Sequence, residues 1–208
     1  MASALDRMFA TAEGDGAVAG GTWTRAFADT SATPQKLADV AAEVYMPVSA
    51  DGGRLLYGLV RAARPAAVVE FGTSFGISTL YLAAAVRDNG GGRVVTTEMS
   101  AAKVAAARRT FAETGLDDLV TVLEGDARET LADLRGPVGL VLLDGWKDLY
   151  LPVLRLLEPR LAPGAPVVGD DIAFAGVKPY LDYVRDPANG YESVAFPVED
   201  GMEVSCRV

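Results

Sequence analysis

The chain has 208 residues, 50% of them hydrophobic and 23% charged, and is therefore long enough to fold as one globular domain with a full core. It contains no histidine, which excludes Ser-His-Asp and Cys-His nucleophilic sites and histidine-ligated zinc. The net charge of -9 argues against a nucleic-acid partner, because affinity for the phosphate backbone depends on Lys and Arg.

The sequence shows no segment that would direct it into or across a membrane. No apolar stretch approaches the roughly 20 residues that a membrane helix requires. The N-terminus has no basic region followed by an apolar run, the pattern of a signal peptide. The single cysteine, Cys206, excludes an intrachain disulfide. We therefore expect a cytoplasmic protein with no membrane partner.

The N-terminal part has the weakest pattern. Residues 1–33 are rich in Gly, Ala, Thr and Asp and show little periodicity beyond a short helix over 4–9. We expect a partly ordered segment, which is either a lid, a dimer arm or a surface segment. From residue 34 onward apolar residues recur at helical spacing, and a second helix is predicted over 51–63. Residues 34–208 are predicted to form a single domain.

Farther along the chain, short apolar runs suited to buried strands alternate with helical patterns. The strands are predicted over 67–71, 93–98, 119–124, 138–143 and 166–169. The helices between them are predicted over 77–86, 101–114, 127–134 and 150–161. This alternation indicates right-handed βαβ units and a parallel sheet that is covered on both faces.

The C-terminal part departs from this alternation. After a helix around 177–185, two strand-like pieces over 191–196 and 202–208 are joined through Glu199-Asp200-Gly201, which contains an Asp-Gly hairpin signal. These pieces are predicted to pair antiparallel at the edge of the sheet. The expected fold class is α/β, a Rossmann-like, doubly wound sheet of seven strands, mostly parallel, with an antiparallel C-terminal edge hairpin.

Acidic residues lie at or near the end of every predicted parallel strand. They are Glu70, Glu98, Asp126, Asp144 and the pair Asp170 and Asp171. In an open α/β sheet the ligand crevice lies outside the carboxyl ends of the strands. The row of acids therefore indicates a ligand with cationic or hydroxyl groups, or a metal ion.

The turn after the first strand narrows this choice. Gly72 and Gly76 form G-x-x-x-G, and Ser74 stands where a dinucleotide-binding G-x-G-x-x-G has its second glycine, so a dehydrogenase is disfavoured. An acid before Gly72 and a helix N-terminus after it suit an amino-acid moiety, with its carboxylate on the helix start and its ammonium toward Glu70. The alternative is a tight turn without a ligand.

The second strand adds a sugar-binding group. Glu98 is placed to accept both hydroxyls of a ribose, and ammonium, carboxylate and ribose together indicate S-adenosylmethionine. Asp126 is either a helix N-cap or a partner of the adenine amino group. Met99 and Ala127, which adjoin these acids, complete this part of the predicted cofactor site.

A second cluster is predicted where the fourth and fifth strands end. These neighbouring strands would bring Asp144 close to Asp170 and Asp171. Three carboxylates that close repel one another unless they are protonated or bridged by a cation, and oxygen ligands select Mg²⁺, Ca²⁺ or Mn²⁺. The alternative is that Asp144 and Asp171 only cap helices.

From about Tyr45 to its end, the chain resembles the class I S-adenosylmethionine-dependent methyltransferases, and within them the cation-dependent catechol and caffeoyl-CoA type O-methyltransferases. Asp144-x-Trp146-Lys147 is similar to the D-x-W-K element of that family, which implies that Asp144 binds the metal and that Lys147 is the general base. Asp170-Asp171 resembles the D-N pair of metal ligands, with Asp171 in place of Asn. The alternative for Lys147 is a solvated or salt-bridged lysine.

Other motifs extend this resemblance. Met46 and Val48 match the M-N-V element over cofactor and acceptor, and Ser78 matches the hydroxyl that holds the cofactor carboxylate. Trp146 either flanks the adenine or fills the core. The resemblance also implies a homodimer. An acceptor-orienting Glu of the animal catechol enzymes has no clear counterpart, so a catechol substrate does not follow from the motifs.

The reaction that the resemblance implies is methyl transfer from S-adenosylmethionine to a hydroxyl of a small, aromatic, catechol-like acceptor, assisted by a divalent cation, with Mg²⁺ favoured. Two alternatives stay open: a metal-independent O- or N-methyltransferase of the same fold, and a non-catalytic cofactor-binding module.

Overall fold

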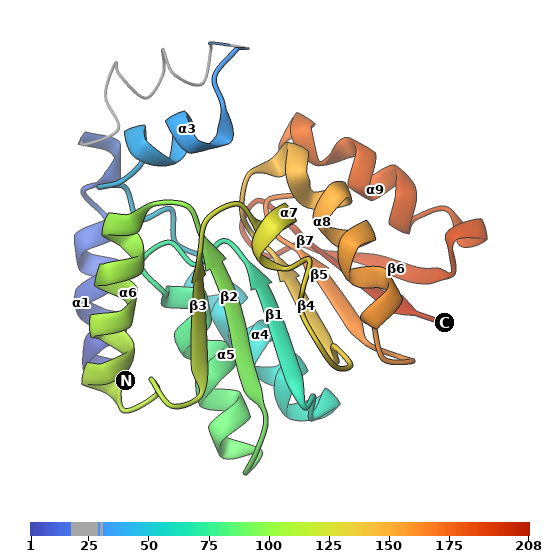
Figure 1. The fold of residues 1–208 in the computed structure, drawn as a ribbon, viewed down its shortest axis with the longest axis horizontal. Helices are drawn as coiled ribbons and strands as arrows, with labels where there is room; N and C mark the ends of the chain where they lie inside the picture. Colours follow the sequence, from blue (N-terminus) through green and yellow to red (C-terminus); the bar gives the residue numbers. More distant parts are fainter. Residues whose placement is uncertain (18–28, 30) are drawn as a thin grey trace.

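The computed structural model describes residues 1–17, 29 and 31–208, and its centre is a seven-stranded sheet in the order β3-β2-β1-β4-β5-β7-β6 (Figure 1). The strands are β1 (Ala67–Phe71), β2 (Arg93–Glu98), β3 (Val120–Glu124), β4 (Leu140–Leu143), β5 (Pro166–Gly169), β6 (Tyr191–Phe196) and β7 (Met202–Arg207). The first five are parallel, whereas β7 runs antiparallel to both β5 and β6. The predicted fold class is confirmed, including the C-terminal hairpin.

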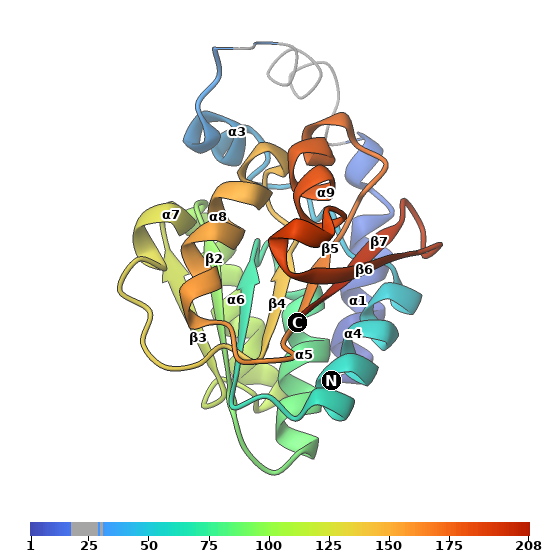
Figure 2. The same ribbon diagram turned by 90° about the vertical axis from the view of Figure 1, so that its right-hand side faces the viewer.

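Helices cover both faces of this sheet. They are α1 (Ala2–Ala12), α3 (Pro34–Val40), α4 (Ala50–Ala63), α5 (Ile77–Asp88), α6 (Ala101–Thr114), α7 (Ala127–Thr130), α8 (Tyr150–Leu157) and α9 (Lys178–Val184). In Figure 2, α1 and α4 lie on one side of the sheet and α7 and α8 on the other. Short 3₁₀ turns follow β4, α8, β5 and α9.

The core has two layers because successive side chains of a strand point to opposite faces. Val68 packs in the layer under α4, α5 and α6, and Val69 packs in the layer under α7, α8 and α9; both side chains are fully buried. This double burial explains why the parallel strands are continuously apolar rather than alternating.

Two helices are shorter than predicted. The helix predicted over 127–134 ends after one turn at Thr130, and the helix predicted over 150–161 ends at Leu157. Pro159, which has no backbone N–H, lies in the 3₁₀ turn that follows.

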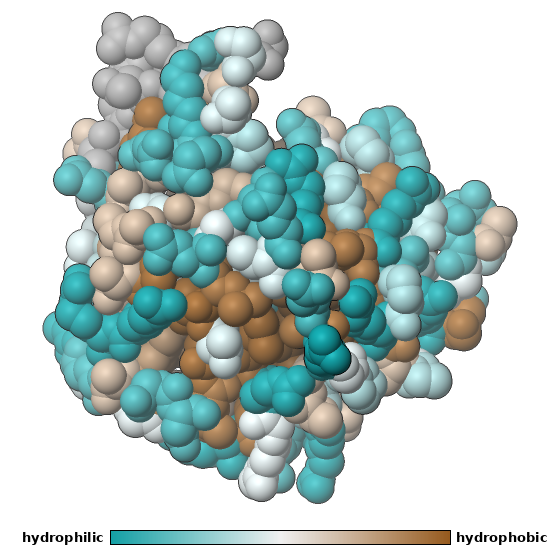
Figure 3. Space-filling model, viewed as in Figure 1, coloured by the Kyte–Doolittle hydropathy of each residue, from teal (hydrophilic) through white to brown (hydrophobic). Residues whose placement is uncertain are grey.

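Figure 3 shows apolar side chains in the lower centre of the face below the short α7, surrounded by hydrophilic ones.

The N-terminal helix is longer than predicted and belongs to the core. Helix α1 buries Ala4, Leu5 and Met8, and Arg7 forms an ion pair of 2.6 Å with Glu113 of α6. Part of the predicted lid or arm, residues 18–28 and 30, lies outside the described residues. The boundary between 1–33 and 34–208 stays a prediction. In the described ranges no helix has both the length and the apolar character needed to cross a bilayer.

Candidate active site

A cavity of about 910 Å³ opens at the carboxyl ends of the parallel strands, where the sequence predicts a ligand. Its walls come from the turns after β1, β2, β4 and β5 and from the segment 45–48. The predicted site residues that line it are Met46, Val48, Gly72, Ser74, Ser78, Glu98, Met99, Asp144, Trp146, Lys147, Asp170 and Asp171. The structure therefore brings most of the predicted residues together.

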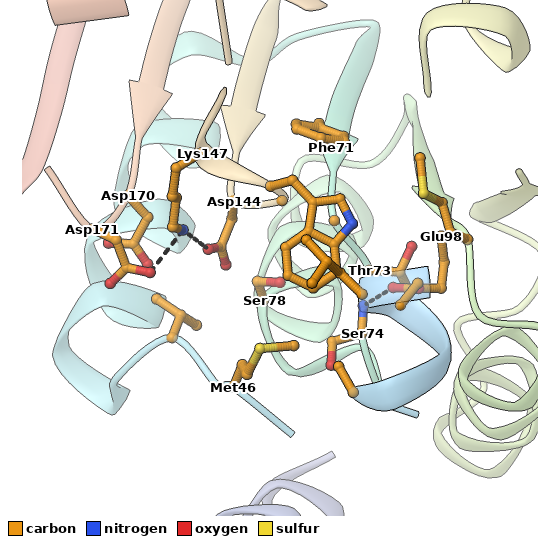
Figure 4. Close-up of a pocket in the computed structure, with 18 of the residues that line it drawn as sticks. Met46, Phe71, Thr73, Ser74, Ser78, Glu98, Asp144, Lys147, Asp170 and Asp171 are labelled. Carbon is orange, nitrogen blue, oxygen red and sulfur yellow. Dashed lines mark hydrogen bonds and ion pairs between the residues drawn. The ribbon is translucent and has the colours of Figure 1, made fainter. Parts of the chain in front are cut away.

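The three aspartates of the predicted metal site meet at one end of the cavity (Figure 4). Asp144, Asp170 and Asp171 each offer a carboxylate oxygen, and these oxygens lie within 4.8 Å of one another. Burial, together with repulsion from Asp170, raises the pKa of Asp144 well above its usual range. Burial and the neighbouring Asp171 raise the pKa of Asp170 to about 7. This concentration of negative charge on hard oxygen ligands fits a divalent cation such as Mg²⁺.

Asp171 occupies an unusual backbone position. Its φ of 56° lies in the left-handed region, which Asp and Asn tolerate better than other non-glycine residues. This preference explains why either of the two residue types suits the position, and it turns the Asp171 carboxylate toward the cluster.

Lys147 lies between the aspartates. Its Nζ is 2.7 Å from Asp171 Oδ2 and 3.5 Å from Asp144 Oδ1 (Figure 4). Burial acts to lower the pKa of Lys147, but the carboxylates around it outweigh burial and raise this pKa above its usual value. In this arrangement Lys147 is an ammonium group that partly neutralises the cluster.

Tyr150 is a site residue that the sequence reasoning missed. Its phenol is fully buried, accepts a hydrogen bond of 2.8 Å from Lys147 Nζ and donates one of 3.1 Å to the carbonyl oxygen of Asp170. The available signal was its place at the start of a predicted helix, three residues after Lys147. The tyrosine holds the lysine amine in place.

We expect Tyr150→Phe to lower turnover about threefold to tenfold, because Lys147 loses a hydrogen-bond partner whose net contribution is about 0.5–1.5 kcal/mol. Steady-state kinetics and calorimetry with S-adenosylhomocysteine measure the effect, and cofactor affinity should not change. Tyr183→Phe is the matched control, because it removes a phenol hydrogen bond to Glu158 away from the cavity. Equal turnover in the two variants would contradict the role of Tyr150.

Glu70, a predicted partner of the ligand ammonium, does not line the cavity. Its side chain is fully buried outside the cavity lining and accepts hydrogen bonds of 2.6, 2.5 and 2.5 Å from Ser78, Thr79 and Thr96. Burial raises its pKa, although the three hydroxyl groups act against this rise. The reason is geometric: Glu70 is paired with Thr96 across β1 and β2 and points into the layer under α5. It therefore ties these elements together.

Gly72 sets the distance between the first turn and β4. Its φ is 103°, and a Cβ there would lie 2.4 Å from the carbonyl oxygen of Asp144. The first turn therefore runs directly against the start of the Asp144 loop, and only glycine permits this approach.

Gly72→Ala is expected to destabilise the fold by about 1–3 kcal/mol or more and to weaken cofactor binding, because it combines backbone strain with a clash. Thermal unfolding and calorimetry measure the two effects. Gly58→Ala serves as the control, since a Cβ at this position of α4 would meet nothing within 4 Å. A Gly72→Ala protein as stable as the Gly58→Ala protein would show that the close approach is unimportant.

Glu98 lies at the other end of the cavity, beside Ser74 (Figure 4). Its two carboxylate oxygens accept hydrogen bonds of 2.8 Å from the backbone N–H groups of Ser74 and Ser100. Each oxygen retains acceptor capacity for a ligand hydroxyl. Ser74, with a φ of 46°, donates its hydroxyl to the carbonyl oxygen of Tyr45 at 2.6 Å. The acid and the turn therefore hold each other in position.

Three other predicted cofactor residues lie outside the cavity lining. Gly76 permits close packing, because a Cβ would lie 2.7 Å from the ring of Phe111. Asp126 caps α7 through the Arg128 N–H and forms an ion pair with the Arg128 guanidinium, so the capping alternative describes it. Ala127 is buried in the core. These three residues shape the turns and do not line the cavity, so the cavity does not support their predicted contacts with the cofactor.

The segment 45–48 is held over the cavity by the N-terminal region. The Asp15 carboxylate accepts hydrogen bonds of 2.9 and 2.8 Å from the N–H groups of Tyr45 and Met46. The Tyr45 ring stacks on Phe75 with centroids 4.0 Å apart. Met46, which is 39% exposed, has a φ of 45°. Asp15 thus helps to hold the segment 45–48 at the cavity.

Lys103 is a second residue that the sequence reasoning missed. It follows Ser100, the N-cap of α6, and lines the cavity near Glu98. The available signal was its place in the first turn of a helix that starts beside a strand-end acid. The site therefore contains two lysines rather than one.

Comparison with known proteins agrees with this fold. The family described as "Methyltransferase domain" matches residues 69–172, half of the chain, and the chain belongs to this family. The chain is 33% identical over 174 residues to catechol O-methyltransferase B of Danio rerio, with 77% of this chain and 65% of that protein covered. It is 36% identical over 149 residues to "Probable O-methyltransferase Rv1703c" of Mycobacterium tuberculosis, with 66% and 63% covered.

The chain spans a little less than two thirds of the length of these two relatives. Among solved structures, the O-methyltransferase of Bacillus cereus in complex with SAH superposes with a TM-score of 0.70 at 21% identity. This match covers 84% of the chain and 89% of that protein. It shows that the two proteins share a fold.

Proposed function

We propose that this protein is an S-adenosylmethionine-dependent O-methyltransferase that acts on a small, aromatic, catechol-like acceptor with the help of a divalent cation, with Mg²⁺ favoured. The observation that carries the proposal is the cluster of Asp144, Asp170 and Asp171 around Lys147, at one end of a cavity whose other end holds Glu98. Similarity to catechol O-methyltransferase B supports the acceptor class.

The cofactor would lie between the first turn and Glu98. Glu98 accepts the ribose hydroxyls, while Ser74, Ser78 and the N-terminus of α5 receive the carboxylate. Since Glu70 is buried, Asp144 beside Gly72 takes the ammonium instead. Met46, Val48, Met99 and Trp146 supply apolar walls. The SAH bound in the Bacillus cereus protein supports this choice of cofactor.

The divalent cation would be held by Asp144, Asp170 and Asp171. When bound, it supplies positive charge that lowers the pKa of an acceptor hydroxyl and orients two vicinal oxygens. The acceptor requires this help because a phenol of pKa about 10 is mostly protonated at pH 7, and its deprotonation costs about 4 kcal/mol.

With the cation bound, its charge would replace that of the Lys147 ammonium at the cluster and lower the pKa of Lys147, so that the lysine would lose its proton to solvent. The neutral amine would then take the acceptor proton while the acceptor oxygen attacks the sulfonium methyl group in line and S-adenosylhomocysteine leaves. Tyr150 keeps the lysine amine at the cluster, and Phe174, which is 52% exposed, forms part of the acceptor wall.

One observation favours a second candidate. Lys147 forms ion pairs with two carboxylates of the cluster and so compensates part of its charge without a metal. A metal-independent O- or N-methyltransferase of the same fold is therefore the alternative, and a non-catalytic cofactor-binding module is the other rival.

Methyl transfer from labelled S-adenosylmethionine to a panel of catechols, phenols and amines distinguishes these functions. We expect turnover of a catechol with Mg²⁺, loss of turnover in EDTA and recovery when Mg²⁺ is added in excess. Turnover that persists in EDTA supports the metal-independent alternative. Binding of S-adenosylhomocysteine without turnover of any acceptor supports the binding module.

We also propose a homodimer, because the edge strand β6 exposes Val194 and Phe196 at 56% and 38%. Light scattering during gel filtration tests it, and a monomer at all concentrations contradicts it. Cytoplasmic location stays a prediction from the sequence.

A further inference from the structure

Lys103 places a buried positive charge in the cavity wall. It is the third residue of α6, lines the cavity and is only 2% exposed. Its Nζ donates a hydrogen bond of 3.1 Å to Ser74 Oγ and lies 5.5 Å from the centroid of the Phe75 ring. In the described part of the chain, it forms no ion pair with a carboxylate.

The Lys103 ammonium does not use all of its hydrogen-bond donors. An ammonium has three N–H donors, and one of them is used by Ser74 while the Phe75 ring is a weaker partner. A buried charge that forms no ion pair is costly. Burial lowers the pKa of Lys103 to about 8, although Glu98 and Asp15 act to raise it. The N-terminal end of α6 carries a partial positive charge, which also favours an anion at this position.

We propose that Lys103 binds the carboxylate of the cofactor's amino-acid moiety and at the same time positions Ser74. This inference rests on the proposed function, because that carboxylate is the one anionic group of S-adenosylmethionine. The hydrogen-bond chain from Lys103 to Ser74 and on to Tyr45 places the lysine against the turn that leads into α5. Glu98, which is held by two backbone N–H groups, binds the ribose hydroxyls, so Lys103 is available to bind the carboxylate.

This role differs from that of Lys147. Lys103 contacts a part of the cofactor that does not react, so its charge contributes to affinity for the whole cofactor rather than to the chemical step. It also favours ligands that carry the amino-acid moiety over nucleosides that lack it.

Calorimetry with two probes tests the proposal. S-adenosylhomocysteine carries the carboxylate, whereas 5′-methylthioadenosine has the adenine, ribose and thioether without the amino-acid moiety. Lys103→Met is expected to weaken the binding of S-adenosylhomocysteine about 10- to 100-fold, which is the contribution of a charged hydrogen bond. The affinity for 5′-methylthioadenosine should not change. At saturating S-adenosylmethionine, kcat should be retained while KM rises. Lys178→Met, the same change at an exposed site, is the matched control.

A pH series provides an independent readout. Affinity of the wild type for S-adenosylhomocysteine should decline between pH 7 and 9, because Lys103 loses its proton above a pKa of about 8. Lys103→Arg keeps its charge over this range, so its affinity should decline less. The carboxylates of Glu98 and Asp15, which act on the pKa of Lys103 without forming an ion pair with it, and the amino group of the probe are the same in both measurements.

Each outcome is decisive. Equal weakening of the two probes in Lys103→Met indicates a purely structural role and overturns the inference, as does unchanged affinity for both. If Lys103→Met does not fold, the comparison of the wild type with Lys103→Arg decides, and parallel pH profiles overturn the inference. A wild type that binds neither probe contradicts the proposed function itself.

Discussion

Asp170→Ala is expected to reduce metal-stimulated turnover at least about 100-fold while the affinity for S-adenosylhomocysteine is retained. The Asp170 carboxylate follows β5 and belongs to the three-aspartate cluster, whereas the proposed cofactor contacts come from the turn at Gly72 and from Glu98. Initial rates across a Mg²⁺ titration, together with calorimetry, measure the two quantities separately.

Asp171→Asn is the control for this prediction. Asn keeps an oxygen ligand, tolerates the left-handed backbone and restores the D-N pair that the sequence resembles. We expect this variant to remain active, because it removes a negative charge without removing the ligand atom. Full Mg²⁺-stimulated activity in Asp170→Ala contradicts the metal site.

Lys147→Met is expected to lower kcat about 10²- to 10⁴-fold, the contribution of a positioned general base. Metal affinity should not weaken, because the substitution removes a positive charge that lies 2.7 Å from Asp171 Oδ2. Single-turnover rates with saturating cofactor and a Mg²⁺ titration measure these effects.

Lys147→Arg separates the charge of the lysine from its ability to take a proton. The guanidinium stays protonated at all accessible pH values, so it preserves the charge but not the base. Turnover of Lys147→Arg equal to that of the wild type refutes proton transfer to Lys147. A loss as large as that in Lys147→Met supports it.

Much of the site follows from the chain order of its residues. Acids at the ends of successive parallel strands must gather at one edge of the sheet, so the meeting of Asp144 with Asp170 and Asp171 was predictable. Chain order does not, however, determine which way each side chain points. Asp126 illustrates this limit, because its two interpretations differ only in whether the carboxylate turns toward its own helix or toward the cavity.

The sequence by itself determined the α/β class, the parallel strands with their C-terminal hairpin and the residues of the acidic cluster, because these depend on periodicity and on strand ends. Only the tertiary structure decided that Glu70 is buried among three hydroxyl groups, since this depends on its register with Thr96 and on the packing of α5. Likewise, only the tertiary structure placed Lys103 against Ser74, because α6 and the turn after β1 are distant in the chain. The spacing of Tyr150 from Lys147 was a signal, but the structure decided that the two side chains share a hydrogen bond.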